Sequence, residues 1–104
     1  MVTTRTLPEI EIIPDEVEQT ALEPLYRVII HNDDVTPMNF VVHVLERIFF
    51  VLPVDATVIM LKAHYTGAAV VQVLPKSEAE KRIGKAHFAA GLEGYPLRFT
   101  MEPE

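Results

Sequence analysis

From residue 25 onward, hydrophobic and polar positions follow periods that separate strands from helices. Leu25–Ile30 and Leu97–Met101 alternate from one face to the other, which is typical of strands with one buried face. Ala68–Leu74 contains almost no polar residue, which favours a strand at the centre of a sheet. The pattern therefore predicts three strands.

Two segments between the first and second predicted strands carry apolar residues at helical spacing. Met38–Phe50 has one continuous apolar stripe, and Thr36 and Pro37 before it suit the N-cap and first helical positions. Val54–Thr66 is predicted as a second helix, which Gly67 ends. One side of this second helix carries three apolar residues, which are Val54, Val58 and Leu61.

A third helix is predicted after the second strand. Ser77 and Glu80 have the spacing of a capping box at its start, and Gly94 marks its end. The order is therefore strand, helix, helix, strand, helix, strand (β-α-α-β-α-β). This order predicts an α+β two-layer sandwich, in which three helices cover a three-stranded antiparallel sheet.

Charge and composition divide the chain into two parts. Residues 1–24 hold six acidic residues and one basic residue, and Pro8, Pro14 and Pro24 interrupt any period. We expect a flexible acidic extension there and one folded domain over residues 25–104. The folded part carries nine acidic and eight basic residues, so it has no excess of positive charge.

These numbers exclude several classes of partner. Nucleic acid is not expected as a partner, because binding to phosphate groups needs a basic face. No apolar run approaches the roughly 20 residues of a membrane span, so no membrane contact is expected, and the first residues lack the apolar segment of a signal peptide. Because the chain also has no cysteine, the cytoplasm is the expected compartment.

A cluster of hydrogen-bond acceptors lies between the first predicted strand and the first predicted helix. Asn32, Asp33 and Asp34 are held there on a short connection between two rigid elements. Such a cluster suits a ligand that brings several donors and a positive charge. The alternative is an ordinary solvated turn, in which Asn and Asp are common.

Other chemistries find less support in the sequence. Ser77 is the only serine and is better explained as a helix cap, so no catalytic triad is predicted. His64 shares a helix face with Met60, and both residue types are ordinary in a core. A metal-ligand set without helical i, i+4 spacing is also conceivable, and its members are His31, Asp33, Asp34 and His64.

Three separated motifs carry a resemblance to a known family. They occur in the family's order along the chain, and they are Asn32–Met38 with Phe40 and Val41, then Ala56 and Thr57 with Ile59–Leu61, His64 and Gly67, and finally Pro96 and Leu97 with Thr100–Glu102. On these motifs, residues 25–104 resemble ClpS, the adaptor family that hands N-degron substrates to the Clp AAA+ protease.

The resemblance implies a binding function and no catalysis, cofactor or metal. By the family's pattern, Asn32, Asp33 and His64 bind the α-amino group of a substrate's first residue. The family reads Leu, Phe, Tyr and Trp as first residues, in an apolar pocket. The matching pocket positions in this chain are Ile30, Thr36, Met38, Val41, Met60, Ala63 and Leu97.

The resemblance also implies a protein partner. The family docks on the N-terminal domain of a Clp AAA+ unfoldase, of the ClpA or ClpC type, and uses its N-terminal extension to engage that unfoldase. Ser77, Glu80 and Arg82 match part of the docking surface, and the adaptor is expected to be a monomer. This chain departs from the family at Ala63, where Val is frequent, at Asn39, which replaces an acid of the first helix's cap, and at Ser77, where an acid is usual.

Two other functions remain open. One is a docking module that modulates the unfoldase without reading N-terminal residues. The other is a small metal-dependent enzyme built on the His and Asp set given above. The joint presence of Asn32, Asp33, Met38 and His64 favours the N-degron adaptor over the docking module.

Overall fold

The computed structural model describes residues 22–104. The extension predicted over residues 1–24 therefore lies outside the described residues, except for its last three. The elements occur in the predicted order, and they are β2 (Leu25–His31), α2 (Met38–Arg47), α3 (Pro53–Thr66), β3 (Ala68–Pro75), α4 (Lys76–Glu93) and β4 (Arg98–Pro103). The predicted α+β fold with a three-stranded antiparallel sheet and three helices is confirmed.

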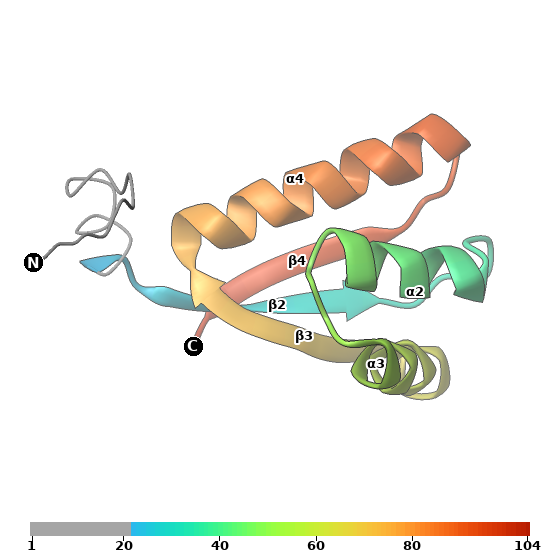
Figure 1. Cartoon of the computed structure of the whole chain (residues 1–104), viewed down its shortest axis with the longest axis horizontal. Coiled ribbons are helices and arrows are strands. Elements are labelled where there is room, and N and C mark those ends of the chain that lie inside the picture. Colours follow the sequence, from blue (N-terminus) through green and yellow to red (C-terminus); the bar gives the residue numbers. More distant parts are fainter. Residues whose placement is uncertain (1–21) are drawn as a thin grey trace, which may run out of the picture.

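The sheet has the strand order β3-β2-β4, with α4 and α2 on one face and α3 beside β3 (Figure 1). The prediction that Ala68–Leu74 is the central strand is wrong, because β2 pairs with both neighbours and β3 is an edge strand. Two apolar residues of β3, Val70 and Val73, remain exposed, whereas Ala69 and Val71 face the core. The strand is apolar because its inner side meets the core and α3, and this composition does not require a central place.

A β-bulge shapes the middle of β3. Val28 pairs with Gln72 and Ile29 pairs with Val70, so Val71 is an extra residue without a partner on β2. The Gln72 side chain donates a hydrogen bond to the carbonyl of Phe49 at 3.1 Å. The bulge thereby ties the edge strand to the loop that follows α2.

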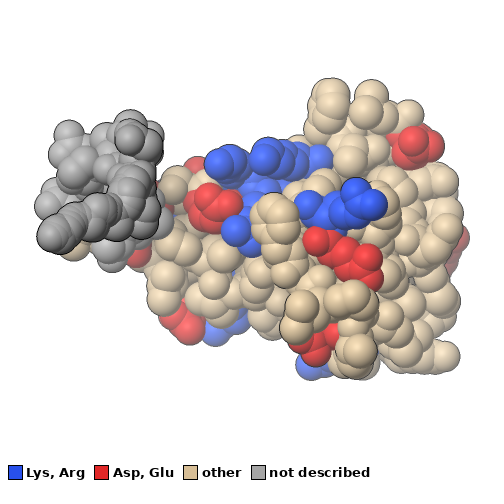
Figure 2. Space-filling view, in the orientation of Figure 1, with Lys and Arg blue, Asp and Glu red and all other residues tan. Residues whose placement is uncertain are grey.

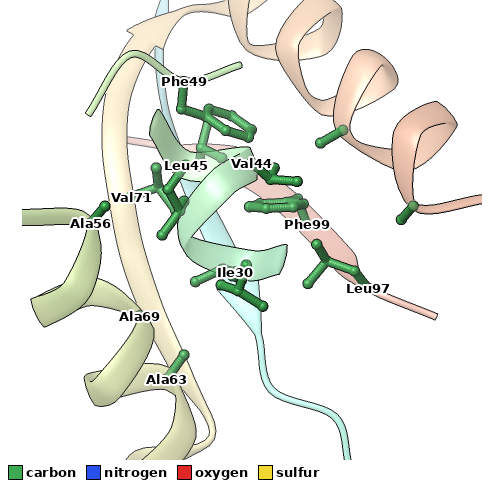
Figure 3. Close-up of a cluster of buried hydrophobic side chains, with 14 of the residues drawn as sticks. Ile30, Val44, Leu45, Phe49, Ala56, Ala63, Ala69, Val71, Leu97 and Phe99 are labelled. Carbon is green, nitrogen blue, oxygen red and sulfur yellow. The ribbon is translucent and has the colours of Figure 1, made fainter. Parts of the chain in front are cut away.

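The core combines large side chains from the sheet and α2 with small ones from α3 and α4 (Figure 3). The Phe49 and Phe99 rings lie 4.9 Å apart between their centroids, in the same buried cluster as Ile30 and Leu45. The buried residues of α3 and α4 are all alanines, namely Ala56, Ala63, Ala79, Ala86 and Ala90. Alanine lets these two helices approach the sheet closely, so large side chains are needed on one side only.

Left-handed residues end two of the three helices, and another follows shortly after the end of α2. Gly67 (φ 99°) ends α3 and Gly94 (φ 76°) ends α4, as the sequence predicts. The helix predicted over Met38–Phe50 is shorter than expected, because Phe50 adopts φ 58° and the Val51 N–H donates to the Leu45 carbonyl at 3.0 Å. This is a Schellman-type ending with Phe in the place that glycine usually takes.

The start of α4 differs from its prediction. The Ser77–Glu80 capping box does not form, and helix α4 begins at Lys76. The carboxylate of Glu23 instead accepts hydrogen bonds from the Ser77 backbone N–H at 2.7 Å and from the Ser77 hydroxyl at 2.9 Å. A residue that sequence reasoning assigned to the extension therefore caps a helix 54 positions away.

None of the described helices is long and apolar enough to cross a membrane.

We predict that Glu23→Ala lowers the free energy of unfolding by about 1 kcal/mol, because it removes the acceptor at the N-terminus of α4. Urea denaturation followed by circular dichroism measures the change. Glu80→Ala is the matched control, since Glu80 is an exposed acid of the same helix, and its effect should stay within about 0.5 kcal/mol. Equal losses in both variants would contradict the assignment of the cap to Glu23.

Candidate functional site

A cavity of about 320 Å³ opens at the carboxyl end of β2, between the following turn, α2 and α3. All ten residues that the resemblance assigned to substrate binding line it: Asn32, Asp33 and His64, together with Ile30, Thr36, Met38, Val41, Met60, Ala63 and Leu97. They come from five segments that span 68 positions of sequence, from residue 30 to residue 97 counted inclusively. The fold therefore brings the predicted set together in one place.

The cavity has an apolar floor and a more polar rim. Ile30, Ala63 and Leu97 are buried, and Ala63 is only 3% exposed. Met38 is 44% exposed and stands at the rim, where the exposed Asn32 and His64 also lie. A ligand that enters the cavity would therefore bury an apolar part and leave a polar part at the opening.

One main-chain hydrogen bond joins the two sides of the rim. The Asn32 N–H donates to the carbonyl of Gly67 at 3.0 Å. Because Gly67 follows the last turn of α3, this bond holds the turn after β2 against the helix end that carries His64. Two motifs that are 35 positions apart, from residue 32 to residue 67, thus form one edge of the cavity.

The turn after β2 is organised by the Asp33 carboxylate. Its Oδ1 accepts hydrogen bonds from the backbone N–H groups of Val35 (2.8 Å) and Thr36 (2.7 Å), and its Oδ2 accepts one from the Thr36 hydroxyl (2.9 Å). The prediction that Thr36 caps α2 with Pro37 as the first helical residue is therefore wrong. Pro37 itself is the N-cap residue and forms no side-chain cap, and the Thr36 hydroxyl is turned back to Asp33.

These hydrogen bonds also set the charge of Asp33. Partial burial raises the pKa of the Asp33 carboxyl, but the bonds from Thr36 and Val35 favour its ionised form more strongly and hold the pKa below its usual value. Asp33 is therefore a carboxylate over the whole neutral range. Its Oδ2 accepts one hydrogen bond from the protein and keeps a second acceptor position.

The cavity has further lining residues that the resemblance did not assign: His31, Asp34, Val35 and Pro37. Asp34 is exposed, and its carboxylate makes no hydrogen bond or ion pair with the described residues. The sequence placed Asp34 in the acceptor cluster and in the conceivable metal set, but the resemblance did not assign it to substrate binding. Adjacent acids give no signal that separates a turn-forming residue from one that faces a ligand.

His31 lies at the end of β2, and its Nε2 is 2.7 Å from the Thr100 hydroxyl. Burial and, to a smaller extent, the positive charge of Arg98 lower the pKa of His31. His31 is therefore neutral at neutral pH and supplies no positive charge to the cavity.

The three predicted docking residues lie away from the cavity, in the first turns of α4. Ser77 contacts Glu23, and Glu80 is exposed. The Arg82 guanidinium points into the molecule, where it donates to Glu78 (2.7 Å), to the Phe49 carbonyl (3.2 Å) and to Gln72 (3.1 Å). Arg82 thus has a structural role in holding the end of α2.

No group of three metal-ligating side chains occurs within residues 22–104. The set of His31, Asp33, Asp34 and His64 lines one cavity but does not converge on a point. The described residues therefore offer the metal-dependent alternative no ligand set.

The fold and the cavity define a small binding domain, whose apolar ligand site has hydrogen-bond acceptors at its rim. A family model described as ATP-dependent Clp protease adaptor protein ClpS matches residues 21–100. The chain belongs to this ClpS family, which confirms the resemblance seen in the sequence.

Similar proteins agree with this membership. The adapter protein ClpS 2 of Mesorhizobium japonicum is 43% identical over 99 residues, which are 95% of this chain and 94% of that protein. The adapter protein ClpS of Roseobacter denitrificans is 45% identical over 86 residues, 83% of this chain and 76% of that protein. A solved structure of Agrobacterium tumefaciens ClpS2 bound to L-phenylalaninamide matches with a TM-score of 0.75 and 40% identity, over 78% of this chain and 98% of that one.

The Asp33 turn predicts a stability effect that depends on pH. Because the folded-state pKa lies below the unfolded value, Asp33 contributes stability above the ordinary aspartate pKa of about 3.9, and this contribution is lost as the pH falls through the folded pKa. We predict that Asp33→Ala lowers the free energy of unfolding by roughly 1–2 kcal/mol at pH 7 and by less in strong acid.

Urea denaturation at neutral and acidic pH measures this difference. Asp33→Asn is the matched variant, because its amide oxygen can still accept the two backbone N–H groups, and it should lose less stability than Asp33→Ala. A loss in Asp33→Ala that is the same at both pH values would contradict the role of the ionised carboxylate.

Proposed function

We propose that this chain is a non-enzymatic adaptor that binds proteins through a hydrophobic N-terminal residue, namely Leu, Phe, Tyr or Trp, and delivers them to a Clp AAA+ unfoldase. One observation carries the proposal: a single cavity joins an apolar floor to a rim of acceptors. A free N-terminus offers the complementary pattern, an ammonium group next to one side chain. The unfoldase is proposed to be of the ClpA or ClpC type.

The rim matches an ammonium group in charge and in hydrogen-bonding capacity. An ammonium group carries three N–H donors and one positive charge. We assign it to the Asn32 side-chain oxygen, the His64 imidazole and the carboxylates that follow Asn32. Asp33 contributes the remaining acceptor position of its Oδ2, and the neighbouring Asp34, which has no hydrogen-bond partner among the described residues, contributes a second carboxylate.

The floor matches one apolar side chain. A volume of about 320 Å³ lies at the lower end of the range of small-ligand sites, which suits one residue better than an extended peptide. Ile30, Val41 and Leu97 are branched and buried, and Met60 adds an adaptable wall. The similar Agrobacterium tumefaciens ClpS2 binds L-phenylalaninamide, which combines a free amine with an aromatic side chain, and this supports the same ligand class here.

The arrangement of the two ends of β2 supports delivery. The cavity lies at the carboxyl end of β2, and Glu23 and Pro24 contact the start of α4 at its other end. A seven-residue strand is about 23 Å long, so the extension of residues 1–24 joins the domain well away from a bound substrate. The extension and the exposed Glu80 can then engage an unfoldase while the cavity stays occupied.

We predict that His64→Ala and Asp34→Asn each weaken the binding of a Phe-first peptide by roughly 5- to 100-fold. A desolvated ammonium loses about 1–3 kcal/mol when one acceptor is removed. Asp33→Asn tests the other carboxylate with the turn preserved. Fluorescence anisotropy with labelled peptides measures the affinities, and Asp55→Asn, an exposed acid that does not line the cavity, is the control. Unchanged affinity in all three rim variants would exclude this site for the ammonium.

The second prediction concerns selectivity, because Met38 stands at the rim and Ala63 forms the buried floor. A first residue branched at Cβ cannot turn both of its substituents away from Met38. We therefore expect the natural chain to bind Val and Ile poorly as first residues, and we expect Met38→Ala to admit them. Ala63→Val adds volume at the floor and should weaken the binding of Trp more than that of Leu, at a cost of about 1–3 kcal/mol.

A set of peptides that differ only in the first residue measures both effects. The variants act at different depths, so their selectivity changes should be independent. If the natural chain binds Ile as well as Leu, Met38 does not control entry.

A further inference from the structure

The outward side of α3 carries an apolar stripe that the other described residues leave open. The stripe follows intervals of four, three and four residues, and it consists of Val54 (75% exposed), Val58 (58%), Leu61 (38%) and Tyr65 (79%). Such intervals place side chains in a line along one side of a helix, with the spacing of a coiled-coil seam. The core side of α3, with Ala56 and Ala63, is a different face.

The apolar surface continues into the loop before α3. Leu52 is 69% exposed and Phe50 is 70% exposed. Phe50 is held at φ 58°, in the left-handed region that bulky residues rarely adopt, and the Arg82 guanidinium lies 5.0 Å from its ring centroid. A groove of about 460 Å³ runs between this loop, Val58 and the edge of β3 at Val71.

Together these six side chains form a contiguous patch, which we call the α3 seam: Phe50, Leu52, Val54, Val58, Leu61 and Tyr65. Single exposed apolar residues are common, but a contiguous patch marks an interaction surface. The charge distribution agrees, since basic side chains gather along α4 in Figure 2, while the end of the molecule that carries α2 and α3 is mostly uncharged on the face shown. The seam is therefore suited to pack against an apolar surface of a partner.

We propose that the α3 seam pairs with the α3 seam of a second copy of this chain, with the two helices antiparallel. The intervals of four, three and four residues read the same from both ends of the helix. A two-fold axis midway between Val58 and Leu61 therefore places Val58 opposite Leu61 of the second copy, and Val54 opposite its Tyr65. Each of the four helical residues of the seam then meets another apolar residue.

Charge complementarity selects a second copy over an unrelated helix. Asp55 and Lys62 flank the seam on the same side of α3, two turns apart. In the antiparallel arrangement, Asp55 of one copy and Lys62 of the other differ by about 3 Å along the helix axis, and the symmetry repeats the pair. Neither residue forms an ion pair with the described part of its own chain.

The size of the seam sets the expected strength. The contact covers about two helical turns on either side of the two-fold axis. It buries less surface than the roughly 800 Å² per partner of a stable interface, so the dimer should be weak and should depend on concentration. This inference replaces the monomer expected from the sequence. It is independent of the proposed function, because no residue of the seam lines the substrate cavity.

Sedimentation equilibrium of the full chain, over an about hundredfold range of concentration, tests the proposal. The mean mass should rise from that of the monomer towards that of the dimer. Val58→Glu places two like charges near the axis and should weaken dimerisation by more than about tenfold. Leu92→Glu, at an exposed apolar position of α4, is the control and should leave the dissociation constant unchanged.

A charge exchange tests the orientation of the helices. Asp55→Lys alone should weaken the dimer, because it brings positive charges together, and the double variant Asp55→Lys/Lys62→Asp should restore it. Circular dichroism checks that each variant is folded. A monomer at every concentration, a dimer that survives Val58→Glu, or a double variant that fails to recover would each overturn the proposal.

Discussion

The site depends on a single main-chain contact, the 3.0 Å hydrogen bond from the Asn32 N–H to the Gly67 carbonyl. This bond holds the residue after β2, the central strand, next to the end of α3. The left-handed conformation of Gly67 (φ 99°) allows the helix to end there. The acceptors after β2 and the side chains of Ala63 and His64 consequently face one cavity. Because the bond joins backbone atoms, it fixes this geometry without using any side chain that a ligand needs.

The two adjacent carboxylates of the turn illustrate how local hydrogen bonding divides roles between similar residues. Asp33 accepts bonds from Val35 and Thr36 and so shapes the chain between β2 and α2. Asp34 makes no such bond with the described residues and lies exposed on the lining of the cavity. A turn that is already satisfied by one carboxylate can present the other to a cation without a loss of structure.

Much of the fold followed from periodicity, because one-sided burial leaves a direct trace in sequence. The order of elements, the glycine helix ends and the ten cavity residues were all predictable, the last only by resemblance to a family. The failures involve partners that local patterns do not contain. Glu23 caps α4 across 54 positions, and the apolar character of β3 comes from α3 at its edge, which the sequence cannot distinguish from a central position. The outward exposure of Val58 is likewise a result of packing, since small alanines, not the larger residues of α3, face the core.

The central claim is that the cavity recognises a free ammonium group together with an apolar side chain. Isothermal titration calorimetry with L-phenylalaninamide and with its N-acetylated form, at equal pH and salt, tests this claim most directly. The two compounds share the benzyl side chain and differ at the amine, so the comparison isolates the charge and the donors. The account predicts measurable binding of the free amine and a loss of at least about tenfold on acetylation. Equal binding of the two compounds would contradict it.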